Sequence, residues 1–228
     1  MPEAFLVGAL AQSSLLFTAL LVYAFTLPES IVGQLAGFGA GALIAAAAFQ
    51  LVPEAQVSLS ALEVSIWLLV GAAVFAVLDR FIERRFGESG SMGIVVGNVN
   101  DALPESLIFG IQLGGGLALS APLVAAVWIS NIPQVIPPAA DMAASGWPRS
   151  RQALLWGSVV LAAGAFSAVG FLLASAISEA NGARVAAFTI GGLIAMLTTS
   201  MIPFAYRKGG IAAGIWAVLG FAVSLAAS

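Results

Sequence analysis

Long apolar runs, broken by short polar turns, decide what this chain can fold into. Charged residues make up 8% of the 228 residues, against about 25% in a soluble globular domain. A chain this apolar cannot cover a globular surface with polar groups, so we expect the lipid bilayer to be its solvent. The sequence therefore predicts an all-α integral membrane protein, with a single transmembrane domain over residues 1–228.

The apolar runs have the length of membrane-crossing helices. Such a helix needs roughly 20 apolar residues. Eight segments of this kind are predicted, at residues 4–26, 31–54, 60–80, 91–113, 117–142, 152–177, 183–205 and 210–227. The sequences between them are short and carry turn or charge signals, such as TLPES, DRFIERRFGESGS and YRKGG, so no soluble appendage is expected.

The basic residues predict the orientation of the chain. With eight helices, the loops after the third, fifth and seventh helices lie on one side of the membrane. These loops hold Arg80, Arg84, Arg85, Arg149, Arg151, Arg207 and Lys208, whereas Arg184 falls on the other side. Because basic loops face the cytoplasm, both termini are expected on the extracellular or periplasmic side.

The composition excludes several kinds of function. There is no Cys and no His, so disulfides, thiolate ligands and imidazole ligands are absent. The few basic residues are confined to loops, so nucleic-acid binding is not expected. An intramembrane enzyme that used Asp101 and Glu105 as acid and base would lack a nucleophile and a substrate anchor, so no enzymatic activity is expected.

An internal repeat relates the second and the seventh predicted helices. FGAGALIAAAAFQLVPEA (38–55) and FTIGGLIAMLTTSMIPFA (188–205) match at a constant offset, with Pro53 and Pro203 in register. By the helix count the two helices run in opposite directions, which predicts an inverted repeat of the kind common in secondary transporters. A weaker similarity aligns DALPES (101–106) with SNIPQV (130–135). Chance similarity between Ala- and Gly-rich helices is the alternative explanation.

The fourth predicted helix carries polar side chains that are costly inside a bilayer. Asn98, Asp101 and Glu105 are spaced by three and four residues, so they share one face of the helix. Pro104 lacks a backbone N–H, so it is expected to bend the helix and to free the carbonyl group of Asn100. The result would be an oxygen-rich cluster.

The fifth predicted helix repeats this arrangement with Ser130, Asn131, Pro133 and Gln134. Pro133 is expected to free the carbonyl group of Ile129. If the two helices face each other near the bilayer midplane, their oxygen atoms form a site suited to a divalent cation. Two alternatives remain: the carboxylates line a water-filled mouth, or they share one proton as a structural pair.

Further polar residues lie on the second and seventh predicted helices. Gln50, Glu54, Thr199 and Ser200 are candidates for lining the pathway to this site. Ser and Thr side chains commonly bond back to their own helix, so the two interpretations of Thr198, Thr199 and Ser200 are equally open. Glu54 is expected at the outer end of its helix, as an interfacial residue or part of the mouth.

These motifs resemble the ZIP family of divalent-metal transporters. The resemblance is carried by FGAGALIAAAAFQLVPEA, DALPESLIFG, SNIPQ and GGLIAMLTTSMIPFA, and it covers essentially the whole chain. It implies a 3+2+3 fold, in which two inverted three-helix repeats surround the fourth and fifth helices. Those two central helices hold the transport site of the family.

Several positions depart from the pattern of the family. Its fourth helix typically reads His-Asn-x-Pro-Glu-Gly and its fifth reads Gln or His, then Asn or Asp, then x-Pro-Glu-Gly. Glu105, Asn131 and both prolines match, whereas Asp101 stands for the His, Gln134 for the Glu and Ala102 for a ligand of the second metal. Gln50, Thr199 and Phe204 stand where ligands or carboxylates are common. Apart from Asp101, these departures run towards fewer charges and fewer ligands, so a two-metal site is not expected.

The resemblance implies a secondary transporter that moves a divalent cation, zinc or a related metal, towards the cytoplasm by alternating access. Its expected ligands are Asp101, Glu105, Asn131, Gln134, Asn98 and Ser130. The metal would be the transported substrate, and no permanently bound cofactor is expected. Without imidazole or thiolate ligands the site is expected to hold zinc weakly.

A protein of the ZIP fold that has lost transport and acts as a membrane partner or scaffold is the alternative. The expected partners are the metal ion and the lipid bilayer, and a homodimer is left open. The short chain and minimal loops favour the plasma membrane of a prokaryotic cell as its location.

Overall fold

The structure is a computed structural model. It describes the backbone at all positions except 26, 87–90, 116–120, 177–178 and 228. Some side chains within the described helices also lie outside the description, among them those of Asn98, Asp101 and Pro104. The described part of the chain is helical and contains no strand.

The helices follow one another with short connections. In chain order they are α1 (Pro2–Leu21), α2 (Glu29–Ala46), η1 (Ala47–Leu51), α3 (Val52–Ser58), α4 (Ala61–Phe86), α5 (Ser91–Gly114), α6 (Ala121–Ala144), α7 (Arg149–Ala176), α8 (Glu179–Met196), η2 (Leu197–Met201) and α9 (Ile202–Ala227). The segments η1 and η2 are π-helical turns, and each joins the helices on either side without a break.

Two helices continue beyond the apolar segments that the sequence predicted. The structure continues the second predicted helix to Ser58 and the third to Phe86, where the sequence predicted ends at residues 54 and 80. Polar segments therefore extend both helices, because Arg, Glu and Gln are good helix formers even where apolar residues run out.

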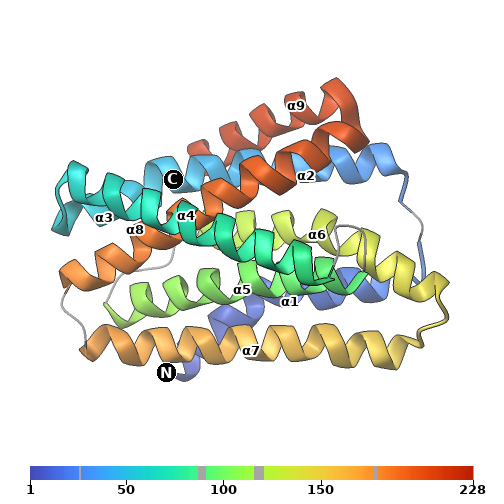
Figure 1. Cartoon of the computed structure of the whole chain (residues 1–228), viewed down its shortest axis with the longest axis horizontal. Helices are drawn as coiled ribbons and strands as arrows, with labels where there is room; N and C mark the ends of the chain where they lie inside the picture. The colour runs from blue at the N-terminus through green and yellow to red at the C-terminus, as the bar shows by residue number, and fades with distance from the viewer. Residues whose placement is uncertain (26, 87–90, 116–120, 177–178, 228) are drawn as a thin grey trace.

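Several long apolar helices make the fold compatible with a multi-pass membrane protein. Within the described residues, five helical segments are long and apolar enough to cross a membrane. The last of them, Asn181–Ala226, turns back on itself at Gly210, whose φ of 57° suits a glycine. This turn falls in the predicted break YRKGG and is visible where the chain reverses into the red part of α9 (Figure 1).

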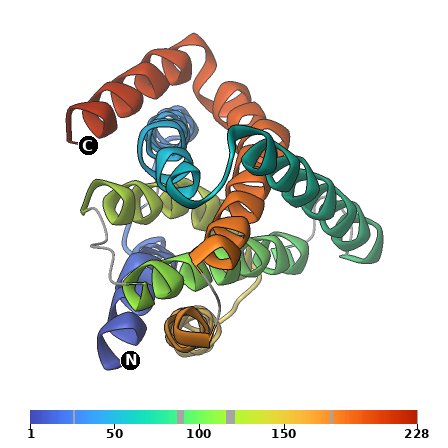
Figure 2. The same ribbon diagram turned by 90° about the vertical axis from the view of Figure 1, so that its left-hand side faces the viewer.

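The long helices lie side by side in one bundle. Successive helices run in opposite directions along the long axis, and both termini lie towards its left-hand side in Figure 1. Viewed from the end, α2 and α9 lie on one side of the bundle, and α1 and α7 lie on the other (Figure 2). Helices α5, α6 and α8 lie between them. The helices α5 and α6, which carry the predicted ligands, are therefore in the middle of the molecule.

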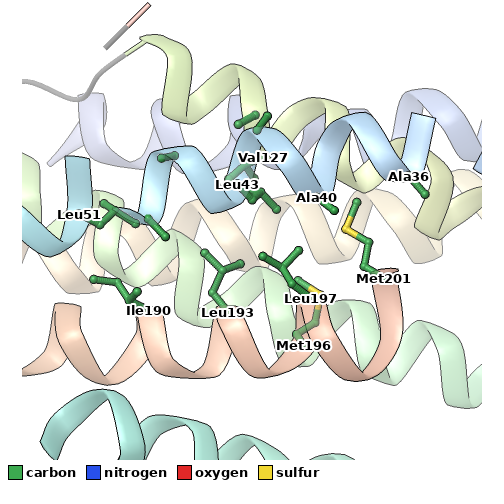
Figure 3. Close-up of a cluster of buried hydrophobic side chains, with 14 of the residues drawn as sticks. Ala36, Ala40, Leu43, Leu51, Val127, Ile190, Leu193, Met196, Leu197 and Met201 are labelled. Atoms are coloured by element: carbon green, nitrogen blue, oxygen red, sulfur yellow. The ribbon is translucent and has the colours of Figure 1, made fainter. Parts of the chain in front are cut away.

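An apolar seam joins the two halves of the bundle. Side chains of α2 meet those of α8 and η2, with Leu43 directed towards Leu193 and Leu197 (Figure 3). Leu43 and Leu197 are almost completely buried. A second buried cluster joins α1, α5, α6 and α7 around Trp156, whose exposed fraction is 0%. These clusters leave the polar residues of α5 and α6 in an apolar surrounding.

Glycines allow two pairs of helices to approach very closely. A Cβ atom on any of these four glycines would collide with a carbonyl oxygen of the facing helix. The pairs are Gly41 with Ala217, Gly220 with Phe38, Gly191 with Leu68 and Gly71 with Phe188. The first two pairs join α2 to α9 and the last two join α4 to α8, so both interfaces use backbone contact that larger residues would prevent.

The two π turns occur at matching places, each two residues before a proline. The N–H of Val52 bonds to the carbonyl oxygen of Ala47, and the N–H of Ile202 bonds to that of Leu197. A proline cannot donate a backbone hydrogen bond, and its ring clashes with the carbonyl group four residues earlier in a regular α-helix. The wider π turn moves that carbonyl group aside, so Pro53 and Pro203 account for both bulges.

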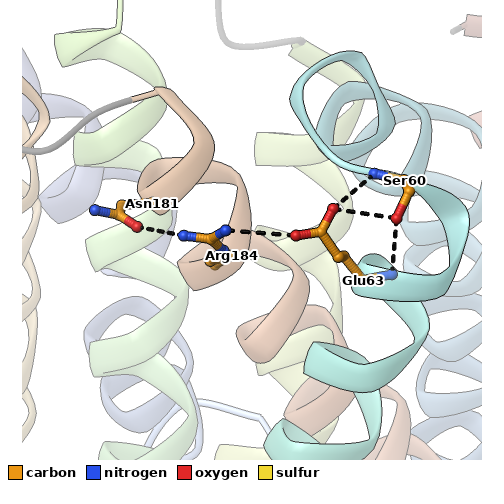
Figure 4. Close-up of polar contacts among 4 residues, drawn as sticks. All are labelled: Ser60, Glu63, Asn181 and Arg184. Atoms are coloured by element: carbon orange, nitrogen blue, oxygen red, sulfur yellow. Dashed lines mark hydrogen bonds and ion pairs between the residues drawn. The ribbon is translucent and has the colours of Figure 1, made fainter.

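Ion pairs and caps mark the two ends of the bundle. At one end, the Oε2 of Glu63 accepts hydrogen bonds from the N–H and the Oγ of Ser60 (Figure 4). The Oε1 of Glu63 lies 3.4 Å from the Nη2 of Arg184, and the Nη1 of Arg184 donates to the Oδ1 of Asn181. The reciprocal bond from the N–H of Glu63 to the Oγ of Ser60 completes a capping box that begins α4.

At the other end, the Nζ of Lys208 lies 2.8 Å from the Oε1 of Glu29. Arg149 bonds to the backbone of Tyr23 there, and Arg151 stacks on the Trp147 ring at 3.8 Å. The end of α4, the beginning of α7 and the turn of α9 all lie towards this end, on the right in Figure 1. The described basic residues of the predicted loops therefore lie towards one end of the molecule.

Candidate functional site

Glu105 is the centre of the candidate site. It lies near the middle of α5 and is partly buried, with its remaining surface bordering two cavities. The described ion pairs are at the ends of the bundle, so no basic side chain in the described part of the chain pairs with Glu105. Its carboxylate is therefore held by neutral groups, in a place where an uncompensated charge is expensive.

A glutamine of α1 makes the closest described contact with this carboxylate. The Nε2 of Gln12 donates a hydrogen bond of 3.0 Å to the Oε2 of Glu105. Gln12 has an exposed fraction of 0%, although it stands in a helix of mostly apolar residues. Buried amides are usually hydrogen-bonded, because an unpaired buried amide costs free energy.

The same glutamine also binds the central residue of α6. The Nδ2 of Asn131 donates to the Oε1 of Gln12 at a distance of 2.7 Å. Asn131 is buried, as the neighbouring Ser130 is. The structure thus connects Glu105 and Asn131, two predicted ligands on different helices, through a side chain of a third helix.

The other predicted ligands of α6 bond within their own helix. The Oγ of Ser130 donates to the carbonyl oxygen of Val127 at 2.9 Å. The Nε2 of Gln134 donates to the carbonyl oxygen of Ser130 at 3.2 Å, and it also lies 4.0 Å from the Sδ of Met201. Gln134 is therefore directed towards η2, and none of its described contacts reaches Glu105.

Two cavities border Glu105. The larger has a volume of about 70 Å³ and lies between α4 and α8. Its described lining consists of Gly71, Val74, Phe75, Leu78, Glu105, Phe188, Thr189, Gly192, Leu193 and Met196. The smaller, of about 20 Å³, lies towards α2 and α6 and shares Glu105, Thr189 and Leu193 with the first. Each can hold at least one water molecule, and Glu105 is the charged group in both described linings.

A second carboxylate–amide pair lies on the same face of α5. Gln112 is seven residues after Glu105, which places it two turns away, or roughly 10 Å along the helix. Its Nε2 donates to the Oε2 of Glu54 on α3 at 2.6 Å, and its buried Oε1 has no partner among the described residues. The predicted mouth residue Glu54 therefore lies half-buried beside α5.

The remaining pathway candidates lie in the two π turns. Gln50 is half-buried in η1, whereas Thr199 and Ser200 are exposed in η2. The hydroxyl groups of Thr198 and Thr199 both donate to the carbonyl oxygen of Ala195, at 2.9 Å. For these two threonines the described bonds return to their own helix.

Three predicted residues lie outside the described side chains. Asn98, Asp101 and Pro104 belong to α5, but their side chains are not described. Within the described residues no group of three His, Cys, Asp or Glu side chains could hold a metal ion. The described part of the site therefore offers one carboxylate, Glu105, with amide groups around it.

Two functional candidates, Gln12 and Gln112, were not predicted from the sequence. Both are isolated amides in apolar helices, and their positions alone give no sign of which helix they meet. A usable signal was present, because an uncharged polar residue in a membrane helix usually finds a polar partner. Gln12 is 93 positions from Glu105 in the chain, so only the packing of α1 against α5 reveals the pair.

No family model matches the chain, and no protein of curated function matches it.

Proposed function

We propose that this chain is a ZIP-like secondary transporter that moves a divalent metal cation, zinc or a related metal, towards the cytoplasm. The cation would bind at a single oxygen-ligand site between α5 and α6. Alternating access would move it, with a gradient as the energy source. The proposal includes eight membrane-crossing helices, an inverted 3+2+3 repeat and a location in a prokaryotic plasma membrane.

The observation that carries this proposal is the carboxylate of Glu105, which lies inside an apolar bundle beside two cavities and without a described basic partner. Ionisable groups in such a place are costly and usually mark the path of an ion or a proton. Two amide side chains lie next to it, because Gln12 donates to Glu105 and Asn131 donates to Gln12. Carboxylate and amide oxygens are hard ligands, which suit divalent cations.

The repeat has support in the helix contacts. The glycine contacts described above come in exchanged pairs: Gly41 and Gly191 are identical positions of the repeat, and so are Phe38 and Phe188. The π turns and their prolines also share the same constant offset. Two halves related by a two-fold axis in the membrane plane would produce such pairs.

The orientation has support in the charges. The described Lys and Arg residues of the three predicted basic loops lie towards one end of the bundle, and Arg184 lies at the other. That end is proposed to face the cytoplasm, because basic loops are retained there.

Cation uptake into proteoliposomes tests the proposal. Zinc, manganese, iron(II), cadmium and cobalt are measured in parallel for the wild type, for Glu105→Gln and for Glu29→Gln. Glu29→Gln makes the same chemical change at an exposed ion pair, so it serves as the matched control. We expect Glu105→Gln to abolish uptake and Glu29→Gln to retain it. Unchanged uptake in Glu105→Gln would contradict the proposal.

A second candidate is a protein of the ZIP fold that has lost transport and serves as a membrane partner or scaffold. The observation in its favour is in the sequence, where Gln50, Ala102, Gln134 and Thr199 stand at positions that hold ligands or carboxylates in the ZIP family. Folded protein that takes up none of the five cations and copurifies with a stoichiometric partner would favour this candidate.

A further inference from the structure

Gln12 connects the two halves of the candidate site through a directed pair of hydrogen bonds. Asn131 donates to the Oε1 of Gln12, and the Nε2 of Gln12 donates to Glu105. The amide of Gln12 uses both of its polar ends, and its side chain is completely buried. The direction is therefore from Asn131 through Gln12 to the carboxylate, which can only accept.

This direction of the hydrogen bonds gives the Glu105 carboxylate a donor, but it disfavours a cation at the same place. The amide N–H of Gln12 places partial positive charge beside Glu105, where a cation would have to lie. A side-chain amide carries its oxygen and its NH₂ group at nearly the same distance, so a half-turn about the last torsion angle exchanges them. That torsion has a broad energy profile, unlike the staggered torsions nearer the backbone.

Rotation of both amides would preserve the bond between them in reverse. The Oε1 of Gln12 would then face Glu105, and its NH₂ group would face Asn131, whose oxygen could accept. The same three residues can thus form a hydrogen-bonded arrangement without a cation and an oxygen-rich arrangement with one. No new contact between helices is needed for the change.

We propose that Gln12 is an amide switch of the transport site. Without a cation it donates to Glu105 and holds the carboxylate in place, and on binding it rotates to supply an oxygen ligand from α1. This inference rests on the proposed transport function, and it names the residue that couples Glu105 to Asn131. A divalent cation that prefers oxygen ligands is the expected occupant.

Two substitutions of Gln12 separate this role from a purely structural one. In Gln12→Glu the side chain keeps its size and offers only acceptors, so the cation should bind more tightly and leave more slowly. In Gln12→Leu the ligand and the donor are both lost, so the cation should bind more weakly. Gln152→Leu is the matched control, because Gln152 is also a completely buried amide but bonds to Tyr23 and Ala139.

The experiment measures KM and Vmax for uptake of the best transported cation, and the rise in Tm that the same cation causes in detergent. We expect KM to fall about tenfold in Gln12→Glu, with a lower Vmax, and to rise about tenfold in Gln12→Leu. The Tm rise should be larger than in the wild type for the first variant and smaller for the second. Gln152→Leu should keep the wild-type KM.

Wild-type KM values in both Gln12 variants, with uptake still lost in Glu105→Gln, would overturn the switch and leave the proposed function intact. A KM that rises in both variants would also overturn it, because a structural role predicts no opposite signs. If Gln12→Leu does not fold, the direction of the change in Gln12→Glu decides. A wild type that neither binds nor transports any cation overturns both the proposed function and the switch.

Discussion

Two arms of the molecule share a backbone design but differ in their polar residues. The first arm (Glu29–Ser58) and the second arm (179–209) each contain a glycine in tight helix contact, a five-residue π turn and a proline two residues later. Beyond the proline, the first arm has Glu54, which binds Gln112, whereas the second arm has Phe204, which packs against the apolar core. Glycine and proline thus determine the shape of each arm, and its polar chemistry can change without altering that shape.

The largest effect is expected from filling the tight helix contacts. Gly41→Leu and Gly191→Leu should each lower the free energy of unfolding by about 1–3 kcal/mol or more, because the added side chain meets a backbone carbonyl of the facing helix. Reversible unfolding in mixed micelles measures the change. Gly214→Ala is the control, since a Cβ atom there has no neighbour within 4 Å. A large loss of stability from only one of the two substitutions would show that the two arms do not depend equally on their glycine contacts.

A smaller effect is expected where the arms differ. Gln112→Leu removes the donor to Glu54 and should cost about 1.5–3 kcal/mol, the value of a hydrogen bond to a charged group. Adding Glu54→Leu should recover part of this loss, because an apolar pair leaves no unpaired carboxylate. A double-mutant cycle measures the coupling. Additive losses would show that the two side chains do not interact.

The prolines test the shared part of the design. Pro53→Ala and Pro203→Ala each restore a backbone donor, so amide hydrogen exchange in the adjoining π turn should slow by roughly 2- to 12-fold in both arms. Cation uptake should change only in Pro53→Ala, because that turn positions Glu54 beside Gln112. Equal changes in uptake in Pro53→Ala and Pro203→Ala would show that the two arms do not differ in this function.

The smallest effect is expected at the polar residues of the second π turn. Thr199→Val should change the free energy of unfolding by less than about 0.5 kcal/mol, because Thr199 is exposed and bonds to its own helix. The KM for cation uptake should also be unchanged in Thr199→Val. A raised KM would instead make Thr199 part of the pathway and bring the two arms closer in function.

Much of the helical layout could be predicted from the sequence. Long apolar runs and Gly or charged breaks locate most of the helices, and the turn at Gly210 lies in a predicted break. The helices that contain the second and third predicted segments continue past residues 54 and 80, because hydropathy does not detect a helix that continues as a polar one. The π turns also escaped prediction, although each of their prolines was identified.

The candidate site was less accessible to prediction. Periodicity within one helix selected Glu105, and a comparison of two prolines selected Asn131, but neither method relates a residue to a distant helix. Gln12 was therefore missed, although it holds the two together. The expected cluster with Asp101 and Asn98 lies outside the described side chains and stays a prediction.

The glycine contacts between α2 and α9 have a consequence for biosynthesis. Helix α2 is synthesised well before α9, the helix that covers Gly41. Until α9 is made, the glycine surface of α2 lacks its partner, and a chain truncated before α9 lacks it altogether. A nascent chain stalled before α9 is therefore expected to be a substrate for protein quality control, and α9 completes the packing of α2.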